Sequence, residues 1–134
     1  MTTGPPDYKT NQMKIEKFED LDCWKKAREL ANLLYDLKNQ RSFGKDFQLR
    51  DQMRDAAGSV MHNIAEGFEA GSDAEFVRFL KISRRSASEV QSELYLAIDR
   101  KYITTNQVQI AYNKGTEVKR LINGLIAYLH RNKK

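Results

Sequence analysis

Basic side chains that could contact phosphate gather in two stretches of the chain. Arg78, Lys81 and Arg85 follow one another at spacings of three and four, so a helix would bring them to one face. The segment 102–134 holds six basic residues against Glu117 alone, a balance equal to the formal net charge of +5 of the whole chain. Such helix faces can lie along a nucleic-acid backbone, where phosphate contacts supply affinity without reading base sequence. The predicted nucleic-acid-binding residues are Arg78, Lys81, Arg84, Arg85, Lys119, Arg120, Arg131, Lys133 and Lys134.

The same charges also fit a solvated helix surface. The acidic residues Asp73, Glu75, Glu89 and Glu66 lie close enough in the sequence to pair with the basic residues of the first stretch. Charge runs usually only solvate a helix, whereas a net charge of +5 favours an anionic partner. The residues alone therefore leave both interpretations open.

Two polar residues and a glycine interrupt the apolar helical pattern near the middle of the chain. The carboxylate of Glu66 could act as an acid or a base if burial shifted its pKa. We favour a structural role, in which Glu66 pairs with Arg78 or Arg54. Asn63 is expected to hydrogen-bond to backbone where two helices or two subunits cross, and Gly67 belongs to the break after this helix.

The remaining candidates for chemistry lack partners at a useful spacing. The Glu-x-x-His pairs that bind di-iron centres in helical bundles are absent, because Ser59 precedes His62 and Ala127 precedes His130 by three residues. No glycine-rich phosphate loop is present. The single cysteine, Cys23, is expected to be a small apolar filler rather than a reactive thiol. We therefore predict no catalytic residue, no metal site and no cofactor, so the protein is not expected to be an enzyme.

Four stretches carry apolar residues at helical spacing, and each begins at a residue that can cap a helix. The predicted caps are Asp20 or Asp22, Asp46, Ser72 and Thr104. The first helix should end between residues 38 and 43. Because no strand-like alternation competes, the pattern predicts an all-α protein, an antiparallel up-down-up-down four-helix bundle over residues 18–134, preceded by a flexible tail at residues 1–17.

Two of the predicted helix starts carry further signals. Ser72 with Glu75 and Thr104 with Gln107 have the spacing of a capping box, and Gly71 can take the positive φ that ends the preceding helix.

Some apolar residues lie away from the predicted bundle seams. The seam of the third helix should consist of Phe76, Leu80, Ser83, Ala87, Val90, Leu94 and Ala97. A lone bundle would expose the apolar residues outside such seams, which predicts a homo-oligomer. These residues are Leu33, Tyr35, Phe79, Ile82 and Leu96.

Two short motifs are the most specific feature of the chain, Asn63-Ile64-Ala65-Glu66-Gly67 and the later pair Glu75-Phe76 and Arg78-Phe79-Leu80. Further positions extend the pattern over about two-thirds of the chain: Phe18, Leu21, Trp24, Leu49, Gln52, Arg54, Ala56, Ala57, Ser59, Val60, Ser86, Glu89 and Leu94. The chain in this way resembles the small four-helix-bundle proteins encoded in intervening sequences of bacterial large-subunit ribosomal RNA genes. It is also similar to the accessory variability proteins of diversity-generating retroelements.

The resemblance implies a ring-forming homopentamer with a basic surface that binds RNA or DNA, and no enzymatic activity. One departure is Met61, where members often carry a proline, so the kink that a proline would introduce into the second helix is not expected here. We expect an accessory protein that positions RNA or a partner such as a reverse transcriptase or an RNA-processing factor. The alternative is an oligomerisation scaffold that binds only proteins. Without an apolar run of about 20 residues, the chain is expected to be cytoplasmic and to make no membrane contact.

Overall fold

The protein is all-helical over the residues that the computed structural model describes, which are 15–38 and 41–132. Its four long helices are α1 (Asp22–Lys38), α3 (Phe47–Phe68), α4 (Asp73–Asp99) and α5 (Thr105–Arg131). Two short elements accompany them, the 3₁₀ turn η1 (Phe18–Asp20) and the helix α2 (Arg41–Lys45). None of these helices has both the length and the apolar character that crossing a membrane requires.

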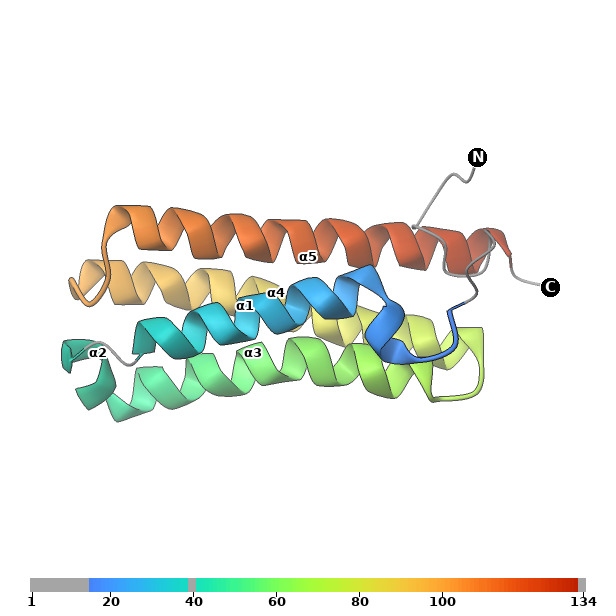
Figure 1. Ribbon diagram of the computed structural model, residues 1–134, viewed down its shortest axis with the longest axis horizontal. Coiled ribbons are helices and arrows are strands. Elements are labelled where there is room, and N and C mark those ends of the chain that lie inside the picture. The colour runs from blue at the N-terminus through green and yellow to red at the C-terminus, as the bar shows by residue number, and fades with distance from the viewer. Residues whose placement is uncertain (1–14, 39–40, 133–134) are drawn as a thin grey trace.

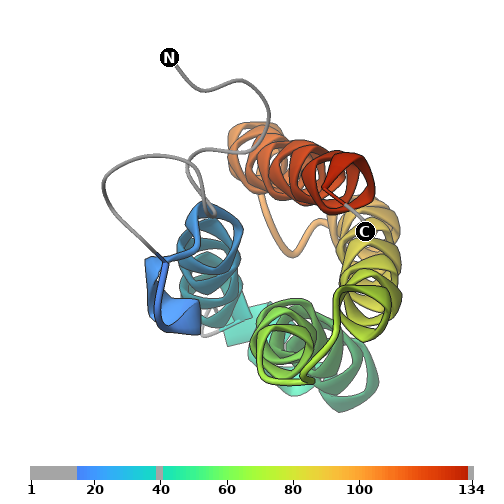
Figure 2. The ribbon, with the colours of Figure 1, turned by 90° about the vertical axis from the view of Figure 1, so that its right-hand side faces the viewer.

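The long helices lie side by side along the length of the molecule as a helical bundle (Figure 1). Seen end on, α3 and α5 each lie between α1 and α4 (Figure 2), and the main contacts are those of α3 with α4, α4 with α5, α1 with α3, and α1 with α5. Each long helix therefore buries one stripe against two neighbours, as its spacing of three and four predicts. All seven residues of the predicted α4 seam are buried.

Three of the long helices start as the sequence predicts. Asp46, Ser72 and Thr104 each accept a hydrogen bond from the backbone N–H three residues further on, at 3.1, 3.2 and 3.1 Å. Thr104 also forms the complete capping box with Gln107. Tyr102 donates a further hydrogen bond of 2.9 Å to the second carboxylate oxygen of Asp46. This hydrogen bond ties the start of α3 to the turn between α4 and α5.

The α3–α4 turn confirms one predicted detail and corrects another. Gly71 has a φ of 94°, the left-handed conformation that the end of α3 requires. The capping box at Ser72 is only half formed. The side chain of Glu75 pairs instead with Arg78, one turn further on, at 3.1 Å.

The start of α1 differs from the prediction, because neither Asp20 nor Asp22 caps it. Asp20 ends the turn η1, and Asp22 is the first residue of α1. Leu21 stands between them with extended backbone, and its carbonyl accepts a hydrogen bond of 3.1 Å from the N–H of Lys25. Leu21 is buried in the core, so burial of an apolar side chain decides where the helix begins.

Three further observations concern the first half of the chain. The sequence pattern does not predict the short helix α2. The helix α3 runs without interruption through Met61, as expected in the absence of a proline. Of the predicted tail, only residues 15–17 belong to the described part, and there Ile15 packs partly buried against the core.

Candidate nucleic-acid interface

The half of the α4–α5 seam nearest the start of α4 is held together by polar side chains. Arg84 donates a hydrogen bond of 2.7 Å from Nη1 to Oδ1 of Asn123. One turn along α4, Lys119 donates a hydrogen bond of 3.1 Å from Nζ to Oγ of Ser88. Both basic side chains thus have neutral partners, so hydrogen bonding orders them without cancelling their charge.

The other half of the same seam is uncharged. Gln91 of α4 donates from Nε2 to Oγ1 of Thr116 and to the backbone carbonyl of Tyr112, both at 3.0 Å. The rings of Tyr95 and Tyr112 meet edge to face, with centroids 6.1 Å apart. Residues that come later in α4 therefore meet residues that come earlier in α5, and the two helices run in opposite directions.

Four of the predicted site residues come together in an open groove between α4 and α5. Its lining consists of Lys81, Arg84, Arg85, Ser88, Lys119 and Asn123, none of which is acidic. None of the four cations forms an ion pair with an acid in the described part of the chain. Because no acid among the lining residues neutralises these cations, the groove presents a positive electrostatic field to an anion.

The other predicted site residues lie outside this groove. Arg78 is exposed, pairs with Glu75 and lies over the ring of Phe79 at 4.5 Å. Arg120 follows Lys119 by about 100° around α5, which turns it away from α4. Arg131 lies over the ring of Tyr128 at 6.0 Å near the end of α5. The predictions for Lys133 and Lys134 fall outside the described residues.

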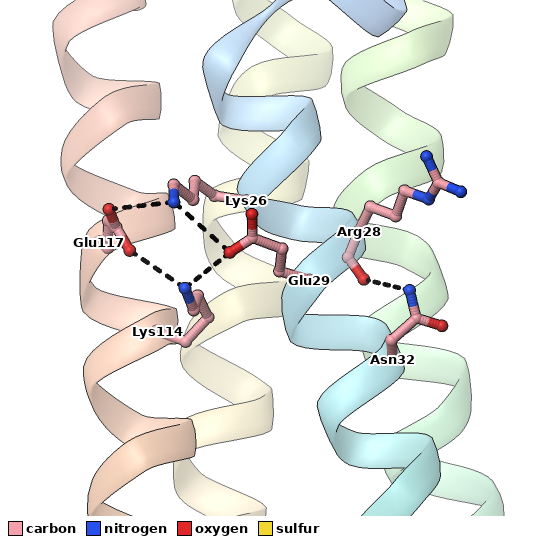
Figure 3. A network of polar contacts seen from close by, with 6 residues as sticks. All are labelled: Lys26, Arg28, Glu29, Asn32, Lys114 and Glu117. Carbon is pink, nitrogen blue, oxygen red and sulfur yellow. Dashed lines mark hydrogen bonds and ion pairs between the residues drawn. The ribbon is translucent and has the colours of Figure 1, made fainter.

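At the seam between α1 and α5, basic and acidic side chains pair and neutralise one another (Figure 3). Lys114 lies 2.7 Å from Glu29 and 3.5 Å from Glu117, and Lys26 lies 3.4 and 3.8 Å from the same two acids. Hydrogen bonding to Glu29 is the main cause that raises the pKa of Lys114 above its ordinary value. Lys114 contributes to the basic balance of the segment 102–134, but its charge is used in ion pairs at the α1–α5 seam.

The contacts of Asn63 and Gly67 agree with structural roles. Asn63 donates from Nδ2 to the backbone carbonyl of Ser59 at 2.8 Å and to its Oγ at 2.9 Å. The Oγ of Ser59 is in turn 2.8 Å from the Oγ of Ser86, where α3 packs on α4. A Cβ added at Gly67 would lie only 2.8 Å from the side chain of Phe76, so this glycine lets α3 and α4 approach closely.

The predicted pairing of Glu66 is wrong. Glu66 is exposed, Arg78 pairs with Glu75, and Arg54 lies 3.5 Å from Asp51 and 4.0 Å from Asp55. The position of Glu66 suggests burial because the residues on either side of it are apolar. The helix turns it outward at the edge of the α3–α4 interface, where water solvates the carboxylate.

Sequence reasoning missed a buried acid, Glu93 of α4. The residue is only 7% exposed, and its Oε1 has no hydrogen-bond partner. Burial raises its pKa to about 7, and the negative charges of Glu89 and Asp55 add to the shift. A sequence signal existed, since Glu89 and Glu93 are like charges four residues apart, on one side of the predicted seam.

Two further observations concern chemistry elsewhere in the molecule. Cys23 is buried, and burial raises the pKa of its thiol to about 12, which agrees with the predicted role as an apolar filler. No group of three or more His, Cys, Asp or Glu side chains within residues 15–38 and 41–132 could hold a metal ion.

Fold and groove together define a small helical-bundle protein with a cationic surface groove. The family model for the 23S rRNA-intervening sequence protein matches residues 19–124, and the chain belongs to this family. The chain is also similar to the crystal structure of a protein with unknown function from the S23 ribosomal protein family of Bacteroides thetaiotaomicron. The identity is 29% and the TM-score is 0.72, over 78% of this chain and 95% of that chain. No curated protein matches the chain.

Proposed function

We propose that this protein is a non-enzymatic accessory protein that binds nucleic acid, RNA in particular, through the groove between α4 and α5. The observation that carries the proposal is the gathering of Lys81, Arg84, Arg85 and Lys119 in one groove without an acid among the lining residues. Phosphate contacts release counterions and supply affinity in proportion to the number of charges engaged. The family is named for an intervening sequence of 23S rRNA, which agrees with an RNA partner.

The remaining basic residues would act at the margins of this groove. Arg78, Arg120 and Arg131 are exposed, and we assign them contacts to phosphates that flank the bound segment. Lys133 and Lys134 follow α5 in the sequence and would add to its positive charge.

Removal of exposed charge from the groove tests the proposal. The side chains of Lys81 and Arg85 are exposed and form no ion pair with a neighbouring helix in the described part of the chain. The double variant Lys81→Gln, Arg85→Gln should therefore fold normally. We expect it to bind RNA more weakly. The slope of log affinity against log salt should fall by about 0.7 for each phosphate of a single strand that the variant no longer neutralises. Titrations of labelled RNA at 50 and 200 mM salt, followed by fluorescence anisotropy, would measure both quantities.

A matched control removes the same charge elsewhere. Lys25 lies on α1, which is diagonally across the bundle from α4 (Figure 2), and Lys17 directly precedes η1. Both are exposed, and the double variant Lys17→Gln, Lys25→Gln should bind like the parent. Equal losses in both double variants would mean that net charge alone attracts RNA. A parent protein that bound no RNA at low salt would favour the alternative, a scaffold that binds only proteins.

We further propose that the protein acts as a homo-oligomer of up-down-up-down four-helix bundles. Leu96 is 42% exposed and Tyr35 is 43% exposed, so apolar surface is left outside the seams, while Leu33, Phe79 and Ile82 are half-buried. The resemblance to ring-forming proteins suggests five subunits, in which repeated grooves would raise avidity. A monomer mass by light scattering at micromolar concentration would refute the oligomer.

The protein would work in the cytoplasm, where it would position RNA for a partner such as a reverse transcriptase or an RNA-processing factor. Pull-down of such a partner that persists after nuclease treatment would distinguish direct protein binding from an association bridged by RNA.

A further inference from the structure

An exposed aromatic ring lies further along the same α4–α5 seam, beyond the cationic groove. Residues 84, 88, 91 and 95 of α4 and residues 112, 116, 119 and 123 of α5 each follow spacings of four and three, so each set forms one stripe along its helix. Successive contacts join the two stripes from Arg84 with Asn123 to Tyr95 with Tyr112. The α4–α5 seam therefore carries cations toward one end and tyrosines toward the other, with the buried Gln91 between them.

Tyr95 is well placed to contact a ligand on this surface. It is 56% exposed, although a ring of this size usually gains by burial. Its edge-to-face contact with Tyr112 orders it, and Tyr112 is itself partly buried against the hydrophobic core. A ring held in this way can accept a flat partner with little further loss of conformational freedom.

The dimensions of the surface suit a short strand of nucleic acid. Tyr95 comes eleven positions after Arg84, which is about 16 Å along the helix axis. A stacked strand advances about 3.4 Å per nucleotide, so roughly five nucleotides would cover the distance. The residues of the two stripes include no acid that would repel the backbone: Arg84, Ser88, Gln91, Tyr95, Tyr112, Thr116, Lys119 and Asn123.

We infer that the α4–α5 groove binds a single-stranded segment of nucleic acid, with phosphates at the cations and an unpaired base stacked on Tyr95. This inference rests on the proposed function, because it assigns the strandedness of the nucleic acid bound at the same groove. A duplex could still reach the cations, but its bases are stacked on one another and offer no free face to Tyr95. Positively charged grooves with stacking aromatics are the usual way in which proteins hold single strands without reading sequence.

The test compares Tyr95→Ala with the parent on three labelled probes at one salt concentration. The probes are a 12-nucleotide single-stranded RNA, the DNA of the same sequence and a 12-base-pair RNA duplex. We expect the parent to prefer both single strands. We expect Tyr95→Ala to weaken single-strand binding about tenfold and to leave duplex binding unchanged. A salt titration of the variant should keep the slope of the parent, because no charge is removed.

Two further variants separate stacking from folding. Tyr95→Phe keeps the ring and should bind single strands within about twofold of the parent. Phe47→Ala removes an aromatic ring that is 62% exposed on α3, outside the two stripes and the proposed oligomer surface, and should bind like the parent. Thermal unfolding of each variant identifies any that fails to fold, in which case Tyr95→Phe and the probe preference of the parent still decide.

The outcomes separate this inference from the proposed function. Equal affinity of the parent for duplex and single strand, or equal weakening of both by Tyr95→Ala, would overturn the single-strand assignment and leave phosphate binding in place. Absence of binding to all three probes at low salt would overturn both.

Discussion

The two flanks of α4 differ in how closely their neighbours approach. Toward α3, small residues allow close packing, as at Gly67 and at the 2.8 Å hydrogen bond between Ser59 and Ser86. Ser83 also donates a hydrogen bond of 2.6 Å to the backbone carbonyl of Val60 there. Toward α5, the outer contacts are made by longer polar and aromatic side chains that leave cations and a tyrosine accessible. We therefore expect the α3 flank to carry stability and the α5 flank to carry the proposed binding.

The sharpest test of the α3 flank is Gly67→Ala. The new Cβ would lie 2.8 Å from both Phe76 Cδ1 and Phe79 Cβ, and the second of these atoms cannot move without its helix. We expect a loss of about 1–3 kcal/mol in the free energy of unfolding, the usual cost of overpacking. Urea denaturation measures it.

Gly124→Ala on α5 is the matched control. No atom lies within 4 Å of the added Cβ, so helix propensity should stabilise this variant by up to about 1 kcal/mol. If the two variants changed stability equally, the close approach of α3 and α4 would not be a constraint.

The second prediction concerns Glu93, a buried carboxyl of α4 whose Oε1 has no hydrogen-bond partner. Its pKa rises from 4.5 unfolded to about 7 folded, so the folded state binds the proton more tightly. Stability should therefore be highest below about pH 4.5 for this group, fall as the pH rises through 7, and level off above. We expect Glu93→Gln to remove this dependence and to stabilise the protein at pH 8 by about 1–2 kcal/mol, less than the full shift at 1.36 kcal/mol per pKa unit because the site relaxes.

Unfolding midpoints of parent and variant between pH 5 and 9 would measure the effect. Glu89→Gln serves as a control, because it removes one of the two repelling charges and should weaken the pH dependence without abolishing it. An identical pH profile in Glu93→Gln would show that the buried carboxyl does not titrate in this range.

A third prediction tests whether the α5 flank tolerates an added methyl group better than the α3 flank does. The Cβ of Gly115→Ala would lie 3.0 Å from Nε2 and 3.1 Å from Cγ of Gln91, a side chain that can change its rotamer. Loss of the hydrogen bonds of Gln91 should roughly balance the better helix propensity of alanine, so stability should change by less than about 1 kcal/mol. A loss as large as that of Gly67→Ala in the same denaturation assay would remove the distinction between the flanks.

The smallest expected effect is on stability in the double variant Lys81→Gln, Arg85→Gln. Both side chains are exposed and form no ion pair within the described part of the chain, so the free energy of unfolding should stay within about 0.5 kcal/mol of the parent. Weakened RNA binding at unchanged stability would separate the two flanks most clearly. A large loss of stability would instead give the cations a structural role.

Local sequence determined most of the secondary structure of this protein. Caps at Asp46, Ser72 and Thr104 and apolar spacing suffice to predict three of the long helices, because capping and amphipathic burial act within a few residues. The start of α1 was less predictable, since the burial of Leu21 competed with two possible aspartate caps.

Only the tertiary structure decided how the charges are used. The sequence showed many cations, but the pairing of α4 with α5 selected Lys81, Arg84, Arg85 and Lys119 for one groove, while packing against α1 neutralised Lys114. It likewise turned Glu66 outward and left Glu93 buried, although both adjoin apolar residues in the sequence. Helical periodicity fixes the angle of a side chain around its own helix, whereas the position of the neighbouring helix decides whether that angle meets solvent, an opposite charge or a packed interior.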